Sequence, residues 1–274
     1  MTTALDLTAV KARQQVTWAS GDYGAVAALI HPISELLVTE ADLSAGARVL
    51  DVATGTGNAA IAAARCGCVV TGVDYVPELL NRGQARAEAE RLPVTFVTGD
   101  AERLAYVDGA FDAVLSVVGV MFAPNQERAA AELVRVCRAG GTVALASWTP
   151  QGFIGELFRT VGRHVPPPAG LRPPVQWGDE GRVRELLGGA VSDLRAVRRE
   201  FVFRFGTPEE FALFFRGNYG PTLKAFEALP EERRPELHAD LVELARTHNR
   251  AADGTVRIPA EYLEVVARRT ADPV

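Results

Sequence analysis

The sequence of 274 residues has little of what marks several classes of protein. Its three cysteines, Cys66, Cys68 and Cys137, are too few for a disulfide framework, and they lack the fourth ligand of a structural zinc site. The most continuous apolar stretch, residues 113–123, is far shorter than the ~20 residues of a membrane span. Residues 1–15 lack the basic-then-apolar order of a secretory signal. We therefore expect a cytoplasmic protein with no membrane span and no bound metal.

Lysine is also scarce, because only Lys11 and Lys224 accompany the arginines among 29 basic residues. The 34 acidic residues give a net charge of −5, which disfavours a large surface that tracks phosphates. We expect no nucleic-acid partner. The arginine pairs at 198–199 and 268–269 are expected on solvated strand faces. With 48% hydrophobic and 23% charged residues, the composition is typical of a globular protein.

Residues 47–148 alternate short apolar strands with helical periods. Strands are predicted at 48–53, 68–73, 94–97, 111–117 and 142–148, and helices at 58–65, 77–91 and 125–138. Strands that alternate with helices predict right-handed βαβ units and a parallel sheet.

The two flanking segments differ from this core. Residues 1–46 predict two helices, over 7–19 and 25–38, and residues after Trp148 hold nine of the twelve phenylalanines. The later segment predicts strands at 199–205 and 261–269 and helices at 207–216 and 231–250. We therefore expect an N-terminal helical lid (1–46), a ligand-binding core (47–150), and a substrate-binding lid with the last sheet strands (151–274).

The most informative stretch is residues 49–58, in which a strand runs into a glycine turn and then a helix. Gly55 and Gly57 let the backbone pass close to a ligand, and a helix N-terminus offers free N–H groups to an anion. Asp74 ends the second predicted strand, 19 residues after Gly55. In an α/β sheet a carboxylate at this position accepts hydrogen bonds from ribose hydroxyls. Together these features predict a ligand that contains adenosine.

Two classes of adenosine-containing ligand fit a glycine turn that is followed by a carboxylate at the end of the next strand. A dinucleotide site favours Gly-x-Gly-x-x-Gly, whereas the run from Gly55 here ends in Ala60. Asp51 lies inside the preceding strand, where its charge would repel a pyrophosphate. It suits a ligand with an ammonium group beside a carboxylate, such as the methionine end of S-adenosylmethionine. An NAD(P)-dependent oxidoreductase is the alternative.

With these motifs, residues 47–148 resemble the Rossmann-like (class I) S-adenosylmethionine-dependent methyltransferases. Further family motifs follow in order at Asp74, 98–102, 111–116 and 132–141. Residues 18–23 and 120–124 resemble motifs of a small-molecule branch, similar to quinone-biosynthesis methyltransferases. The resemblance implies a three-layer α/β fold of about seven strands, mostly parallel with one antiparallel, and helical lid segments. Ala53 departs from the family pattern, since many members carry glycine there.

The resemblance also implies roles for individual residues. The cofactor-binding set is Trp18, Tyr23, Asp51, Ala53, Thr54, Gly55, Gly57, Asp74, Tyr75, Asp100, Ala101, Ser116 and Val117. In it, Asp51 faces the ammonium, Asp74 binds the ribose, Tyr75 packs on the adenine and Asp100 accepts from the adenine amino group. The product would be S-adenosylhomocysteine.

The methyl acceptor is expected to be a small aromatic or apolar molecule, bound by aromatic residues of the later segment. The candidates are Phe153, Trp177, Phe215 and Tyr219. No catalytic base stands out. The one candidate is His164, because it borders the proline-rich residues 166–168. A non-catalytic cofactor-binding protein and, less favoured by charge, an RNA methyltransferase remain alternatives. A monomer or a homodimer fits equally.

Overall fold

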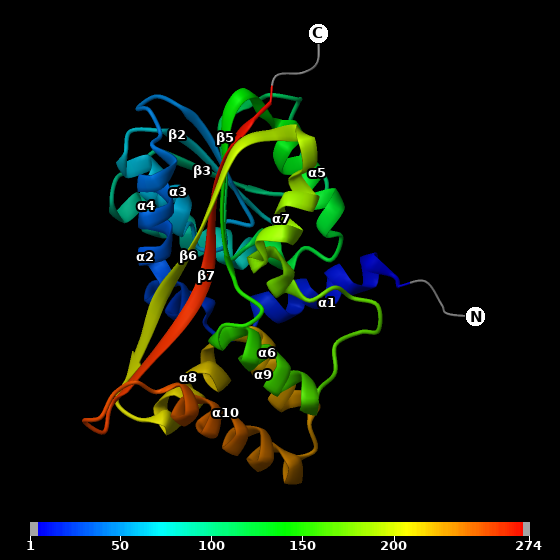
Figure 1. Ribbon diagram of the computed structural model, residues 1–274, viewed down its shortest axis with the longest axis vertical. Coiled ribbons are helices and arrows are strands. Elements are labelled where there is room, and N and C mark those ends of the chain that lie inside the picture. The colour runs from blue at the N-terminus through cyan, green and yellow to red at the C-terminus, as the bar shows by residue number, and fades with distance from the viewer. Residues whose placement is uncertain (1–4, 271–274) are drawn as a thin grey trace.

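The computed structural model describes residues 5–270 and contains a seven-stranded sheet (Figure 1). The strands are β1 (Arg48–Val52), β2 (Val69–Asp74), β3 (Val94–Thr98), β4 (Phe111–Val117), β5 (Cys137–Trp148), β6 (Val191–Phe205) and β7 (Val256–Arg269). Their order is β3-β2-β1-β4-β5-β7-β6. Strands β1 to β5 are parallel, whereas β7 is antiparallel to both β5 and β6. The predicted mixed sheet is confirmed.

Helices cover both faces of this sheet, because its central strands are apolar on both sides. The helices α2 (Tyr23–Ala41), α3 (Asn58–Arg65) and α4 (Pro77–Ala89) lie on one face, and α5 (Gln126–Val136) and α7 (Glu180–Leu187) lie on the other (Figure 1). The prediction placed the α5 helix at 125–138. It ends earlier because the chain is already extended at Cys137, where β5 begins.

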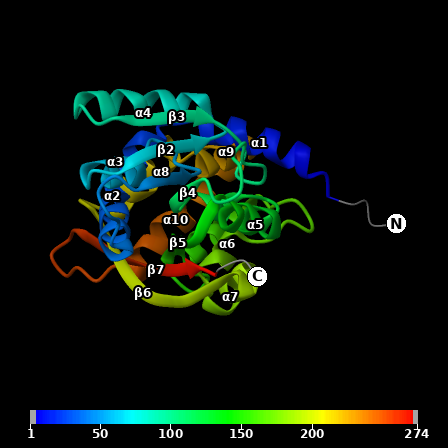
Figure 2. The ribbon, with the colours of Figure 1, turned by 90° about the horizontal axis from the view of Figure 1, so that it is seen from above.

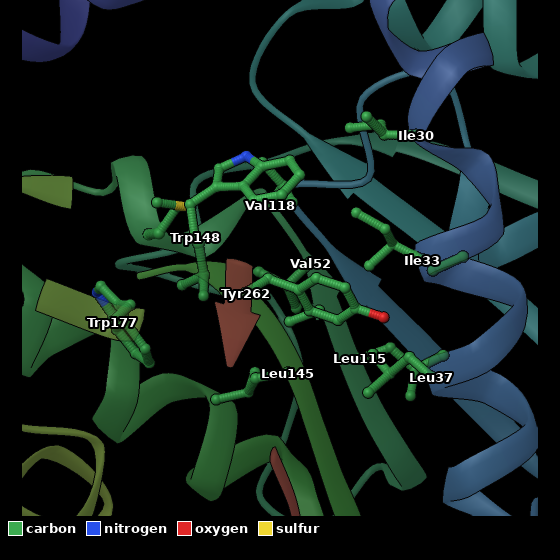
Figure 3. Packing of buried hydrophobic residues seen from close by; sticks show 14 of the residues in the cluster. Ile30, Ile33, Leu37, Val52, Leu115, Val118, Leu145, Trp148, Trp177 and Tyr262 are labelled. Atoms are coloured by element: carbon green, nitrogen blue, oxygen red, sulfur yellow. The ribbon is translucent and has the colours of Figure 1, made fainter. Parts of the chain in front are cut away.

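Helix α2 forms part of the core. Figure 3 shows Ile30, Ile33 and Leu37 pointing from α2 toward the sheet residues Val52 and Leu115. Within residues 5–270, α2 is the one helix long and apolar enough to cross a membrane by length and composition. One side of it is buried against the sheet and α3, and this burial accounts for its apolar character.

The remaining helices gather at one end of the sheet. They are α6 (Phe153–His164), α8 (Pro208–Asn218), α9 (Gly220–Ala228) and α10 (Arg234–His248), and α1 (Leu7–Ala19) lies between them and the core (Figures 1 and 2). Thr207 caps the N-terminus of α8, since its Oγ1 accepts a hydrogen bond from the Glu210 amide. Sequence periodicity did not predict α9, a short helix that packs beside α8.

The two late strands are much longer than predicted. Strand β6 begins at Val191, and a bulge between Ser192 and Arg195 breaks the alternation that strand prediction depends on. The expectation that Arg199 is solvated was wrong. Its Nε lies 2.8 Å from Glu264 Oε2, and the Glu264 side chain is only 1% exposed. Burial of a charge requires a partner, and β6 supplies it.

Candidate active site

A cavity of about 940 Å³ opens at the carboxyl ends of β1, β2 and β4. The predicted residues that line it are Trp18, Tyr23, Asp51, Ala53, Thr54, Gly55, Asp74, Tyr75, Asp100, Ala101 and Val117. We call this space the first cavity. The sheet topology brings these residues together, since neighbouring parallel strands end at the same edge.

The turn after β1 shapes the floor of the first cavity. Ala53, Gly55 and Gly57 have φ angles of 54°, 55° and 83°, in the left-handed region. A Cβ at Gly55 would lie 3.5 Å from the Tyr23 ring, so a side chain there would fill the space between turn and ring. Gly57 does not line the cavity. A Cβ at that position would lie 2.8 Å from Cζ of Phe96, so glycine is needed there for packing.

Asp74 ties two loops together at the end of β2. Its Oδ2 accepts a hydrogen bond from the Gly55 amide at 2.9 Å, and its Oδ1 accepts one from the Val76 amide at 2.9 Å. Burial raises the pKa of Asp74 to about 6, although these amides oppose the shift. Asp74 therefore fixes the glycine turn relative to β2 and presents a carboxyl group to the cavity.

Asp51 lies beneath the first turn of α3. Its Oδ2 accepts hydrogen bonds from Thr54 Oγ1 at 2.5 Å and from the Ala60 amide at 3.0 Å. The side chain is almost fully buried, and burial raises its pKa to about 7 against the effect of those hydrogen bonds. A cation that enters the cavity would favour the ionised form.

Helix α1 closes another side of the first cavity. Lys11 Nζ lies 2.7 Å from Asp100 Oδ2 and 2.5 Å from Glu102 Oε2, and Gln14 Nε2 donates to the Phe122 carbonyl at 3.1 Å. Lys11 and Gln14 line the cavity, and sequence reasoning missed both. One signal was available for Lys11, since it is one of two lysines in a chain that otherwise uses arginine.

A second cavity of about 350 Å³ lies beside the first. The two share Trp18, Tyr23, Ile30, Val118 and Phe122 as lining residues. The other residues of the second cavity are Val26, Trp148, Ile154, Leu157, Phe158, Phe203, Phe215 and Tyr219. None of these lining residues is an acid, histidine, lysine or arginine. Burial raises the pKa of the Tyr23 and Tyr219 hydroxyls, so both stay protonated at neutral pH.

Some predicted residues lie outside both cavities. Ser116 sits behind the first, where its hydroxyl donates to the Val52 carbonyl at 2.7 Å and accepts from the Val120 amide at 2.9 Å. Phe153 and Trp177 are each 1% exposed and line neither cavity. Of the four predicted acceptor-binding residues, only Phe215 and Tyr219 line the second cavity.

The histidines do not supply an obvious base. His164 lines neither cavity, and its Nε2 lies 2.8 Å from Asp240 Oδ2 on α10. His248 is partly buried, because its ring packs on Phe153 and its Nε2 lies 3.0 Å from Glu156 Oε2. Within residues 5–270, no group of three or more potential metal ligands is clustered.

Comparisons with known proteins identify the family. Residues 50–145 match the model of a methyltransferase domain. An uncharacterised protein of Mycobacterium tuberculosis (strain H37Rv) is 44% identical over 259 residues, which cover 92% of each chain. The demethylmenaquinone methyltransferase of Deinococcus radiodurans is 39% identical over 127 residues, which cover 45% of this chain and 53% of that one.

Solved structures share the fold. The YcgJ protein of Bacillus subtilis superposes with a TM-score of 0.61 at 17% identity, over 88% of this chain and all of that one. A phosphoethanolamine N-methyltransferase of Haemonchus contortus, solved with S-adenosylhomocysteine, gives 0.55 at 18% identity, over 88% and 53% of the two chains. The fold and the matched domain define a methyltransferase. The chain belongs to the class I S-adenosylmethionine-dependent methyltransferases.

Proposed function

We propose that this enzyme transfers a methyl group from S-adenosylmethionine to a small, uncharged, aromatic or apolar organic acceptor. The observation that carries the proposal is the second cavity, which is apolar and aromatic and shares a wall with the first. A cofactor in the first cavity and an acceptor in the second would meet at the shared residues Trp18, Tyr23 and Phe122.

The residues of the first cavity fit the cofactor. Its carboxyl groups suit an ammonium and ribose hydroxyls, and its backbone turn leaves room beside Gly55. Two buried polar atoms of lining residues, Gln14 Oε1 and Ser34 Oγ, have no hydrogen-bond partner within residues 5–270, which suits a polar ligand. When bound, the cofactor supplies a methyl group on a positively charged sulfur.

We assign the residue roles accordingly. Asp74 would bind the ribose hydroxyls, Asp51 the ammonium and Asp100 the adenine amino group, with Tyr75 against the adenine ring. Backbone groups of the turn would line the methionine end. They belong to Ala53, Thr54 and Gly55, with Val117 at a neighbouring strand end, whereas the Ala101 amide would lie against the adenine ring. Trp18 and Tyr23 would cover the cofactor from α1 and α2.

The second cavity would act by position and by exclusion of water. Its aromatic walls would hold the acceptor in line with the methyl group, and such positioning can lower a barrier by up to ~7–11 kcal/mol. Loss of charge on sulfur is not aided by water, so an apolar site suits the reaction. Because the lining offers no base, we infer that the acceptor is already nucleophilic or ionises readily. A protonated Tyr219 would donate a hydrogen bond to an acceptor oxygen.

The wider setting belongs to the same proposal. We assign the enzyme to the cytoplasm, as a monomer or homodimer without a nucleic-acid partner. Residues 1–46 and 151–274 would provide the lids and acceptor-binding parts, and residues 47–150 the cofactor-binding core. A non-catalytic cofactor-binding protein is the second candidate, favoured only by the absence of a base in the second cavity.

Methyl transfer to matched naphthalene compounds tests the proposal. We expect transfer from labelled cofactor to 2-naphthol, and at least tenfold less to 2-naphthoate and 2-naphthylmethylamine, whose charges the second cavity would have to desolvate. Tyr219→Phe should lower kcat/KM for 2-naphthol about three- to tenfold, since a hydrogen bond contributes ~0.5–1.5 kcal/mol. Tyr262→Phe is the matched control, because Tyr262 is buried and lines neither cavity.

Two outcomes would contradict the proposal. Preference for the charged compounds would show that the acceptor binds elsewhere. Cofactor binding without transfer to any phenol, thiol, quinone or amine would favour the non-catalytic candidate.

A further inference from the structure

Ser34 on α2 is an unusual residue of the first cavity. Ala27, Ile30 and Ser34 are spaced three and four residues apart, so they share one face of α2, and all three line the cavity. Ser34 is 1% exposed, and within residues 5–270 its hydroxyl has no hydrogen-bond partner. A helical serine ordinarily bonds the carbonyl four residues back or faces water. Ser34 does neither.

A buried hydroxyl without a partner is costly, at about 1–3 kcal/mol. That cost is removed if a ligand provides the partner. Asp51 lines the same cavity from β1, and only its Oδ2 accepts hydrogen bonds within the described chain. Ala59, in the first turn of α3, also lines the cavity. The hydroxyl, the carboxylate and the positive end of a helix dipole are therefore all available to a ligand in the same cavity.

This combination matches a zwitterionic amino acid group. An ammonium can donate to Asp51 and Ser34, while a carboxylate is favoured by the α3 N-terminus and can accept from the Ser34 hydroxyl. We propose that Ser34 is a positioning residue that binds the aminocarboxylate end of the cofactor from α2. The inference rests on the proposed placement of that end beside Asp51. It makes α2 a wall of the cofactor site as well as a core helix.

Calorimetry with two ligands tests this role. S-Adenosylhomocysteine carries the amino and carboxylate groups, whereas 5′-methylthioadenosine shares the adenosine and sulfur but lacks both. Ser34→Ala should weaken binding of S-adenosylhomocysteine about tenfold, as loss of a hydrogen bond to a charged group implies. Binding of 5′-methylthioadenosine should change less than twofold. Ser34→Thr, which keeps the hydroxyl, should retain more of the affinity than Ser34→Ala.

Stability provides an independent readout. Removal of an unpartnered buried hydroxyl and a gain in helix propensity should leave the melting temperature of ligand-free Ser34→Ala unchanged or raised. Ser147→Ala is the control, because Ser147 is buried on β5 and lines neither cavity. Equal weakening of both ligands, or of neither, would overturn the role of Ser34. Failure of the unaltered protein to bind S-adenosylhomocysteine would instead count against the proposed function.

Discussion

The two cavities lie side by side, yet only the first offers charged groups. Carboxyl groups and the backbone of a strained turn line it at the ends of parallel strands, beside apolar residues of α1 and α2. The second is lined by rings and aliphatic chains, mostly from the core helix α2 and from residues after Trp148. Only a few residues, among them Trp18 and Tyr23, face both. A polar, partly cationic ligand and an uncharged one can thus be held next to each other.

The two kinds of specificity have different origins in the chain. Recognition by backbone and carboxylates depends on local turns, which the chain fixes over short stretches, and on which strand ends lie side by side in the sheet. Recognition by aromatic walls depends on which rings the tertiary structure leaves beside the cavity. Further predictions test this contrast, in addition to the experiments given above.

The largest expected effect is at Asp74. Asp74→Ala should weaken S-adenosylhomocysteine binding at least about tenfold, because charge-assisted hydrogen bonds of ~1.5–3 kcal/mol are lost. Calorimetry would measure the dissociation constant, with Asp108→Ala, an exposed acid outside both cavities, as control. An unchanged constant would remove the ribose assignment. Binding of 2-naphthol to the second cavity, measured by calorimetry, should be nearly unaffected.

We expect a smaller effect when the pH is changed during cofactor binding. Burial raises the pKa of Asp51 to about 7 and that of Asp74 to about 6, so both carboxyls are partly protonated near pH 6. An ammonium and ribose hydroxyls favour the ionised forms, so binding should release protons and strengthen as pH rises from 5 to 8. Calorimetry in two buffers of different ionisation enthalpy measures that release. The variants Asp51→Asn and Asp74→Asn should each reduce the number of protons released on binding. An affinity that falls as pH rises from 5 to 8 would contradict the prediction.

The same two carboxyl groups, Asp51 and Asp74, also make the stability of the folded protein depend on pH. In the unfolded chain both carboxyls ionise near pH 4. Between that value and the raised pKa values, the ligand-free folded protein binds more protons than the unfolded chain. The contribution of Asp51 and Asp74 to stability therefore falls as pH rises from about 4 to 7.

The smallest expected effect is at Ala53. Its φ of 54° places a side chain in the left-handed region, at a cost of roughly 1–2 kcal/mol. Ala53→Gly should remove this strain. Part of the gain in stability is offset because glycine increases the conformational entropy of the unfolded chain, so we expect the melting temperature to rise by about 1–3 °C. Thermal unfolding measures the change, with Ala139→Gly on the exposed part of β5 as a control without that strain. A lower melting temperature for Ala53→Gly would show that the methyl group contributes packing instead.

Much of the first cavity could be predicted from sequence. Gly55 and Asp74 lie 19 residues apart in the chain, and the Gly55 amide donates to Asp74 because two parallel strands end side by side. Lys11, Gln14 and Ser34 were missed, since α1 and α2 reach the cavity only in the tertiary structure. Gly57 belongs to the glycine motif and was therefore predicted to bind the ligand. In the structure it does not line the cavity, and glycine is needed there because a side chain would collide with Phe96 on β3.

The turn after β1 and the acids at strand ends are local properties, set by hydrophobic periodicity and by backbone sterics over a few residues. The sequence alone therefore determined the fold class and the adenosine-binding edge. Tertiary structure decided which aromatic rings face a cavity. Phe153 and Phe215 have the same chemistry, but only Phe215 lines the second cavity, because side-chain environment depends on contacts between elements distant in the chain.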